Sequence, residues 1–215
     1  MQTINKRPLI EAIDVKKYFI NGKKALHAVD GISFAIPEKR TLGVVGESGC
    51  GKSTLGRTIL RLVEPTGGQL LFNGKDIYKA GRKEMKTLRR EMNIIFQDPY
   101  SSLDPRMTIV DSIMEPMIIT RCCRTKREAY GKALQLMDSV GLAQRLENAY
   151  PHELDGGRRQ RVGIARTLSV DPKFIVCDEP VSALDVSIQA QILNLLMDLQ
   201  EELSLTYMFI THDMS

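Results

Sequence analysis

Residues 46–53 (GESGCGKS) match the pattern G-x-x-x-x-G-K-[ST] at every fixed position. The preceding residues 42–45 (LGVV) form a continuous apolar run, as expected for a buried parallel strand, and a helix is expected over about residues 53–62. Glycines let backbone N–H groups turn inward around phosphate oxygens, and the N-terminus of the helix adds the positive end of its dipole. Because strand and helix both flank it, the stretch predicts a phosphate-binding loop rather than an unrelated glycine-rich turn.

Two side chains of this loop carry specific chemistry. Lys52 can reach the β- and γ-phosphates of a nucleotide, and the hydroxyl of Ser53 can ligate Mg²⁺. The loop residues expected to hold the phosphates are Gly46, Ser48, Gly49, Cys50, Gly51, Lys52, Ser53 and Thr54.

A second motif, residues 174–179 (FIVCDE), is a strand that ends in two acids. Strands of a parallel sheet end at the nucleotide site, so the acids are expected beside the phosphates. Asp178 is predicted to hold Mg²⁺ through water, and Glu179 to act as the general base on the attacking water. Acids after a strand often form only a solvated loop, but behind a phosphate-binding loop they indicate a P-loop NTPase. No Asn-Lys-x-Asp motif of a GTPase is present, and a small-molecule kinase would leave the remaining motifs unexplained.

The composition narrows the class further. The 215 residues are 43% hydrophobic and 26% charged, which suits one compact domain with room for an inserted subdomain. With 30 basic and 26 acidic residues interspersed, the net charge of +4 argues against nucleic-acid binding. No apolar run approaches the ~20 residues of a membrane helix, and no signal peptide is evident. A cytosolic protein, or one bound to the cytosolic side of a membrane, is expected.

The four cysteines have no zinc-ligand spacing and are expected to be reduced thiols. Cys50 differs from the others because it sits in the phosphate-binding loop, where an exposed thiol could be oxidised or alkylated.

The rest of the chain predicts a mixed fold. Residues 9–15 are expected to form an edge strand, and further strands are expected at 31–36, 69–72, 93–96, 174–177 and 207–210. Asn73 and Gly74 signal a hairpin turn. Residues 125–140 place apolar side chains on one helical face, with Gly141 as a stop.

Taken together, the motifs resemble those of the ABC ATPase family across essentially the whole chain. Gln97 resembles the Q-loop glutamine, residues 154–158 (LDGGR) lie at the position of the family's LSGGQ signature, and residues 182–185 (SALD) resemble its D-loop. His212 resembles the switch histidine, and Phe19, together with the neighbouring Tyr18, resembles the aromatic residue that stacks on adenine.

The resemblance implies the fold and further site residues. The fold is an α/β P-loop NTPase (RecA-like) core with an antiparallel β subdomain, in residues 1–103 and 169–215, and an inserted α-helical subdomain in about residues 104–168. Gln97 and His212 are implied to be catalytic with Glu179, and Gln97 also to sense Mg²⁺. Two subunits are implied to sandwich ATP head to tail, so that one subunit's signature residues bind the other's nucleotide. The implied additional contacts to ATP come from Leu154, Asp155, Gly156, Gly157 and Asp185. No member of the family ends near Ser215, so a C-terminal part is expected to be absent.

A narrower resemblance lies in residues 97–108 and 180–189, which are similar to importer ATPases for oligopeptides, dipeptides and nickel. It implies ATP hydrolysis coupled to import, a second ATPase subunit (identical or different), transmembrane permease subunits, and an extracytoplasmic binding protein that delivers the solute. The subunit is implied to lie on the cytoplasmic face of the membrane. A soluble ABC-type ATPase is the competing reading, but such proteins carry long coiled-coil insertions or two tandem ATPase units, which are not found here.

The signature departs from the family pattern, because Asp155 and Arg158 replace its serine and glutamine. An ionised Asp155 cannot donate to a γ-phosphate, and its charge ~4 Å from a phosphate costs between ~1 and ~4 kcal/mol, depending on the local dielectric. Arg158 could offset this charge. Asp155 could also simply cap the helix that starts near Gly157, and the two effects can coexist.

Overall fold

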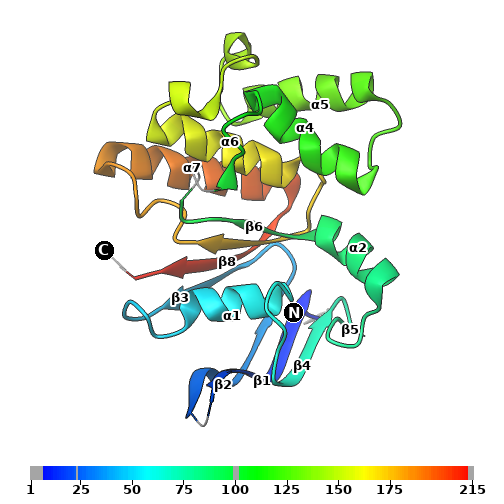
Figure 1. The fold of residues 1–215 in the computed structure, drawn as a ribbon, viewed down its shortest axis with the longest axis vertical. Helices are drawn as coiled ribbons and strands as arrows, with labels where there is room; N and C mark the ends of the chain where they lie inside the picture. Colours follow the sequence, from blue (N-terminus) through cyan, green and yellow to red (C-terminus); the bar gives the residue numbers. More distant parts are fainter. Residues whose placement is uncertain (1–6, 23, 99–101, 213–215) are drawn as a thin grey trace, which may run out of the picture.

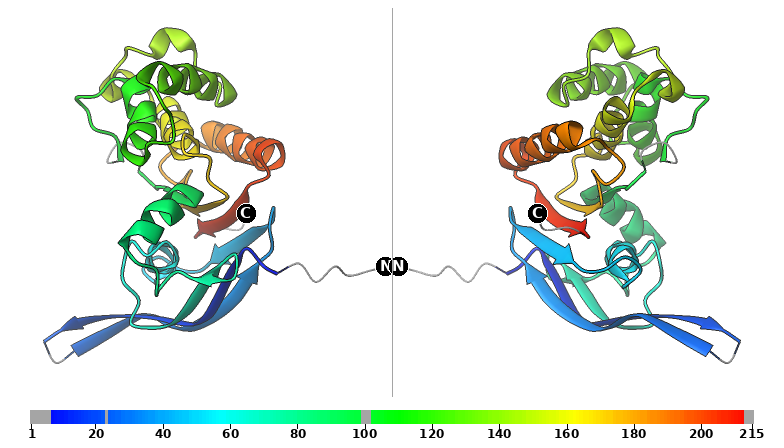
Figure 2. Two further views of the ribbon diagram at one scale, coloured as in Figure 1. Left: turned by 90° about the vertical axis from the view of Figure 1, so that its right-hand side faces the viewer. Right: turned by 90° about the vertical axis from the view of Figure 1, so that its left-hand side faces the viewer.

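The computed structural model describes residues 7–22, 24–98 and 102–212. The described residues form two four-stranded sheets and the helices that pack on them (Figure 1; Figure 2 shows two further views). The antiparallel sheet has the order β2-β1-β4-β5 and the parallel sheet the order β3-β8-β7-β6. The strands are β1 (Ile10–Asn21), β2 (Lys24–Ile36), β3 (Thr41–Val45), β4 (Gly67–Phe72), β5 (Lys75–Asp76), β6 (Met92–Ile95), β7 (Phe174–Asp178) and β8 (Thr206–Thr211).

The helices cover both faces of the parallel sheet. Figure 1 shows α1 between the two sheets, α6 and α7 on the opposite face of the parallel sheet, and α4 and α5 farther out. The helices are α1 (Lys52–Ile59), α2 (Arg82–Glu91), α4 (Ile109–Thr120), α5 (Lys126–Ser139), α6 (Gly156–Leu168) and α7 (Val186–Leu203). Two short 3-10 helices, Gln144–Leu146 and Pro151–Glu153, connect α5 to α6.

The core is divided by strand β7, which is buried along its whole length. Phe174 and Val176 face the cluster around α1 and the antiparallel sheet, whereas Ile175 and Cys177 face the cluster under α4 to α7. This alternation is what a strand covered on both faces requires. The site residues that follow β7 are therefore held from two sides.

Two expectations about strands are wrong. Residues 9–15 do not form an edge strand, because β1 pairs with both β2 and β4, with register shifts on both sides. The register shifts interrupt the alternation of apolar and polar side chains along β1. Its sequence pattern therefore resembled that of an edge strand. Strand β3 is parallel, as predicted, but it pairs only with β8 in the described part of the chain, and Val45 is exposed.

Local signals confirm other predictions. Asn73 and Gly74 both have positive φ and join β4 to β5 in a hairpin. Thr125 accepts a hydrogen bond from the Glu128 backbone N–H at the start of α5, and Gly141 takes a left-handed conformation just after its end. No helix within the described ranges has the length and apolar character needed to cross a bilayer.

Candidate nucleotide site

The predicted loop connects β3 to α1, as its strand and helix context required. Gly49 and Gly51 take positive φ of 77° and 99°. A Cβ on Gly51 would lie 2.0 Å from the Ala28 carbonyl oxygen, so only glycine lets the loop pack this closely on β2. The glycines therefore both shape the loop and seat it on the antiparallel sheet.

Lys52 is almost fully buried within the loop that it belongs to. Its Nζ donates to the carbonyl oxygens of Gly46 and Glu47, each over 2.7 Å. These are neutral acceptors, whereas charged phosphate oxygens make stronger charge-assisted bonds. The ammonium group is thus held at the loop and can exchange its carbonyl partners for phosphate.

Asp178 lies at the end of β7 and is 2% exposed. Its Oδ1 accepts a hydrogen bond of 2.7 Å from the Ser53 hydroxyl, and its Oδ2 lies 3.7 Å from Nη2 of Arg57. A buried carboxylate needs such partners to remain charged. The structure thus brings the two predicted Mg²⁺-binding residues into contact and adds a cation beside them.

Glu179 is the centre of a second cluster. Its Oε2 accepts a hydrogen bond of 2.9 Å from the Gln97 amide and lies 3.5 Å from Nδ1 of His212. The Gln97 amide also donates to the Ser182 hydroxyl over 3.2 Å. Glu179 has a left-handed φ of 48°, which is an uncommon conformation for a residue other than glycine. The three residues predicted to be catalytic therefore meet at one carboxylate oxygen.

A cavity of about 440 Å³ is lined by residues of both groups, by Ser53 and by the Gln97–Glu179 pair. It is lined by Phe19, Leu26, His27, Ala28, Ser48, Gly49, Cys50, Gly51, Lys52, Ser53, Thr54, Gln97 and Glu179. The aromatic Phe19 is 43% exposed at this cavity. Tyr18 is instead engaged with β2, where it stacks on His27 and its hydroxyl donates to Asp30. Of the two candidates for stacking on a base, the geometry favours Phe19.

The signature residues lie elsewhere, at the start of α6. Asp155 caps this helix, because its Oδ1 accepts a hydrogen bond of 2.7 Å from the Arg158 backbone N–H. Its Oδ2 also lies 3.4 Å from Nε of Arg158. The predicted helix cap is confirmed, and α6 begins at Gly156.

The other predicted signature and D-loop residues pack around this helix end. Leu154 is buried, and Cβ atoms on Gly156 and Gly157 would meet Leu184 and Ile188 at 3.1 and 2.7 Å. Asp185 is exposed just before α7. Neither this residue nor the signature lines the cavity of about 440 Å³. The signature and Asp185 therefore lie apart from the cavity that Lys52 and Glu179 share.

The donors around the phosphate loop fit Mg²⁺. Ser53, Asp178 and Gln97 offer hydroxyl, carboxylate and amide oxygens, which are the ligand types that Mg²⁺ accepts. In the described part of the chain no group of three or more His, Cys, Asp or Glu side chains could hold a metal alone. Mg²⁺ usually takes one or two protein ligands and completes its shell with phosphate and water, so Ser53, Asp178 and Gln97 fit this ion.

Some residues around the site were not anticipated. Arg57 approaches Asp178, and its place one helical turn after Ser53 was a usable signal. His27 and Leu26 line the cavity only because β2 pairs with β1. Nothing in the local sequence indicated that contact.

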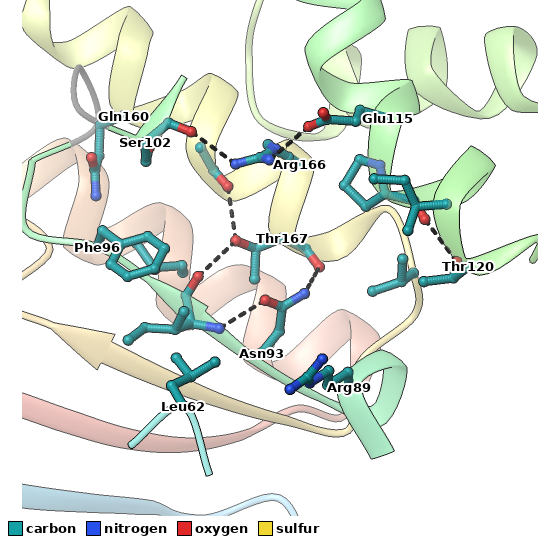
Figure 3. Close-up of a pocket in the computed structure, with 16 residues that line it drawn as sticks. Leu62, Arg89, Asn93, Phe96, Ser102, Glu115, Thr120, Gln160, Arg166 and Thr167 are labelled. Carbon is teal, nitrogen blue, oxygen red and sulfur yellow. Dashed lines mark hydrogen bonds and ion pairs between the residues drawn. The ribbon is translucent and has the colours of Figure 1, made fainter. Parts of the chain in front are cut away.

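A separate groove of about 360 Å³ lies between β6 and helices α4 and α6 (Figure 3). Arg166 crosses it, donating to the Ser102 carbonyl oxygen over 2.9 Å and to Glu115 over 2.7 Å. Phe96 lines the groove, and the next residue, Gln97, lines the nucleotide cavity. One short segment therefore borders both sites.

The sequence of this chain is similar to those of known transport proteins. The chain is 52% identical to the oligopeptide transport ATP-binding protein OppF of Bacillus subtilis over 208 residues, which are 96% of this chain and 68% of that protein. It is 47% identical to the dipeptide transport ATP-binding protein DppF of Escherichia coli over 215 residues, covering 97% of this chain and 64% of that protein. The chain thus spans about two thirds of the length of these relatives.

Solved structures match as well. The dimeric post-hydrolysis structure of the ATP-binding cassette MJ0796, bound to ADP and Pi, superposes with a TM-score of 0.85 and 30% identity over 95% of this chain and 88% of that one. This match confirms the predicted fold class. A family model described as ABC transporter matches residues 29–182. The chain belongs to the ABC transporter family.

Proposed function

We propose that this chain binds and hydrolyses ATP to drive an importer for oligopeptides or dipeptides. The observation that carries the proposal is the meeting of the Ser53–Asp178 and Gln97–Glu179 pairs around one cavity behind a phosphate-binding loop. The choice of solute rests on the relatives, which are named as oligopeptide and dipeptide transport proteins.

The nucleotide lies along the cavity from Phe19 to Glu179. The base stacks against the exposed ring of Phe19, and the amides of residues 46–53 surround the phosphates. Lys52 moves from the Gly46 and Glu47 carbonyl oxygens to the β- and γ-phosphates.

Ser53 and Asp178 would hold Mg²⁺. When bound, the ion neutralises charge that develops on the phosphates. Glu179 accepts the proton of the attacking water and His212 holds the γ-phosphate and water in line. Gln97 donates a hydrogen bond to Oε2 of Glu179, so it helps to orient the carboxylate toward the water.

The site is completed by a second subunit in a head-to-tail pair. The N-terminus of α6, with Gly156 and Gly157, binds the γ-phosphate of the partner's ATP. The exposed position of Asp155 and Arg158 away from this chain's own cavity supports this arrangement. The related cassette MJ0796 is described as dimeric. Pairing is then favoured with ATP and weakened after hydrolysis.

In this proposal a segment of a permease subunit occupies the groove of Figure 3, and the chain lies on the cytoplasmic face of the membrane. Its position beside Gln97 supports a route by which docking reaches Glu179. An extracytoplasmic binding protein acts only through the permease.

The test is reconstitution with the membrane subunits in vesicles. We expect peptide uptake to require ATP, and both uptake and hydrolysis to be lost in Glu179→Gln. A panel of dipeptides, longer peptides and nickel separates the solutes. Uptake of nickel without peptide would correct the solute, and hydrolysis unchanged in Glu179→Gln would refute the assigned chemistry.

A further inference from the structure

Three sulfur-containing side chains meet where α4 ends. Cys122 and Cys123 follow this helix, and both are half-buried free thiols. Sγ of Cys123 lies 3.6 Å from Sδ of Met117, which is fully buried in the last turn of α4. The Cys122 thiol donates to the carbonyl oxygen of the same Met117 over 3.7 Å. These three residues are here called the sulfur cluster.

The two thiols of the sulfur cluster also interact with each other. The pKa of the Cys123 thiol is raised, first because the group is partly buried and then because the Cys122 thiol lies beside it and forms a hydrogen bond with it. Both thiols therefore lie on the same side of the chain as the Met117 thioether, although adjacent residues of an extended chain point in opposite directions.

The backbone holds the two cysteines from both sides. At the end of α4, Arg121 takes a left-handed φ of 56°, and the Cys122 backbone N–H donates to the Met117 carbonyl oxygen over 3.1 Å. At the start of α5, the Glu128 carboxylate accepts a hydrogen bond of 2.8 Å from the Arg124 backbone N–H. The thiols are thus fixed between two capped helix ends.

The spacing of the sulfurs suits a shared ion. A thiolate lies about 2.3 Å from a bound zinc ion, so two sulfurs on one ion of similar size lie at most about 4.6 Å apart. The 3.6 Å between the sulfurs of Cys123 and Met117 falls within this span. The half-exposed cysteines give an ion access from solvent, and the buried Met117 closes the inner side.

The donor set selects the kind of ion. Thiolate and thioether sulfurs suit Cu(I), whereas Mg²⁺ and Ca²⁺ take oxygen ligands. Structural zinc almost always takes four ligands from Cys, His, Asp or Glu. Over the residues that the structure describes, no cluster of three or more such side chains is able to hold a metal. A soft ion that accepts the thioether of Met117 therefore fits better than zinc.

We propose that the sulfur cluster binds one Cu(I) ion through the thiolates of Cys122 and Cys123 and the thioether of Met117. Binding forms two copper–thiolate bonds and releases two thiol protons to water. Copper remains in the +1 state, so no oxidant or reductant is consumed. The partial negative charge at the C-terminus of α4 favours a cation at this place.

This inference goes beyond the proposed function, because none of the three residues lines the nucleotide cavity. A bound ion joins the last turn of α4 to the loop that leads into α5. Copper binding should therefore stabilise the helical part of the chain, since a ligand that binds only the native state raises its stability.

The test titrates the full, reduced chain with Cu(I) held by bicinchoninate, without oxygen, and follows the colour of the chelator complex. The variants are Cys122→Ser/Cys123→Ser and Met117→Leu. The matched controls are Cys50→Ser, which removes an exposed thiol elsewhere, and Met114→Leu, which changes a buried methionine one turn earlier in α4. Leucine nearly conserves the volume of methionine, so both methionine variants are expected to fold. Thermal melting without copper reports on the integrity of each variant.

We expect the wild-type chain to withdraw one equivalent of Cu(I) from the chelator and the double serine variant to withdraw none. Met117→Leu should weaken binding by about tenfold or more, because changes even around the ligands of a metal commonly cost about 10- to 100-fold in affinity. Both controls should match the wild type. X-ray absorption at the copper edge should show three sulfur neighbours in the wild type and two in Met117→Leu, and copper should raise the melting temperature of the wild type.

Four outcomes overturn the proposal. The wild type withdraws no copper; the double serine variant binds copper as tightly as the wild type; Cys50→Ser loses the bound ion, which then belongs to the phosphate-binding loop; or Met117→Leu keeps both the wild-type affinity and the wild-type sulfur count. If the double serine variant melts well below the wild type, the result for Met117→Leu decides alone. None of these readouts uses ATP hydrolysis or transport, so failure of the proposed function would leave them unchanged.

Discussion

The Ser53 hydroxyl donates a hydrogen bond of 2.7 Å to the Asp178 carboxylate, although the two residues are 125 positions apart. Ser53 lies at the start of α1 and Asp178 at the end of β7. The contact exists because β3 and β7 are parallel to the same neighbour, β8, so their carboxyl ends share one edge of the sheet. The same edge carries Glu179 and His212.

Replacing Asp178 by Asn should abolish the dependence of ATP binding on Mg²⁺. The amide keeps an acceptor for Ser53 but removes the negative charge that attracts the ion. We expect ATP to bind equally well with and without Mg²⁺, and hydrolysis to fall by more than about 100-fold, since a catalytic metal is worth several kcal/mol. Titration with a fluorescent ATP analogue, with and without chelator, measures this. A variant that keeps the wild-type Mg²⁺ dependence would place the ion elsewhere.

Glu179→Gln should separate binding from hydrolysis. The amide cannot accept the proton of water, and a general base contributes about 10²- to 10⁴-fold to rate. ATP affinity and melting temperature should stay close to wild type, because only one oxygen of a partly exposed side chain changes. A rate reduction under tenfold would mean that another residue activates the water.

The Asp155–Arg158 pair should set the properties of the site formed with the partner's nucleotide. We expect Asp155→Ser/Arg158→Gln to speed turnover at that site by about fivefold, since a repulsion of ~1 kcal/mol is removed from an exposed position. Site-resolved turnover in the assembled complex, with the other site blocked, provides the measurement. Identical rates at that site in variant and wild type would leave Asp155 as a helix cap alone.

The role of Asp155 as the N-cap of α6 predicts changes in the free energy of unfolding rather than in turnover. Asp155→Ser should leave the free energy of unfolding nearly unchanged, because serine is an equally good N-cap. Asp155→Ala should cost about 1 kcal/mol. Urea denaturation of both variants distinguishes capping from charge, and equal loss of stability in both would argue against the cap.

Gly56 and Gly163 should respond oppositely to alanine. A Cβ on Gly56 would lie 2.8 Å from Val176 and 2.9 Å from Ile210, both fully buried. We expect a net loss of up to about 2 kcal/mol, because overpacking costs about 1–3 kcal/mol and the gain in helix propensity is only about 1 kcal/mol. Gly163 has open space, so Gly163→Ala should gain about 1 kcal/mol. Denaturant unfolding of both variants tests this, and stabilisation by Gly56→Ala would show that the sheet yields.

Cys50 should be the thiol that controls sensitivity to alkylation. It is exposed and lines the nucleotide cavity, whereas Cys177 is buried and burial raises the pKa of its thiol far above the ordinary value. We expect maleimide to label Cys50 first, to block ATP binding, and to be slowed by bound ATP. Mass spectrometry locates the label. Inactivation that persists in Cys50→Ser would point to Cys122 or Cys123 instead.

Much of the site followed from the sequence because its signals are local. The spacing in residues 46–53 indicates which backbone groups face a phosphate. The acids Asp178 and Glu179, which follow an apolar strand, indicate which side chains do so. Turns and caps were local as well, as Asn73, Gly74, Thr125 and Gly141 show. Such features depend on φ preferences and on hydrogen bonds within a few residues.

The tertiary structure decided what depends on sheet order and side-chain packing. Strand β1 proved to be central rather than at an edge, because pairing on both sides cannot be recognised from one strand's own pattern. Phe19 rather than its neighbour Tyr18 lines the nucleotide cavity, which depends on how β1 pairs with β2. Arg57 approaches Asp178, which lies on a strand distant in the sequence. The sequence thus determined which chemical groups are present. The packing of the two sheets and their helices decided which of these groups lie together in one site.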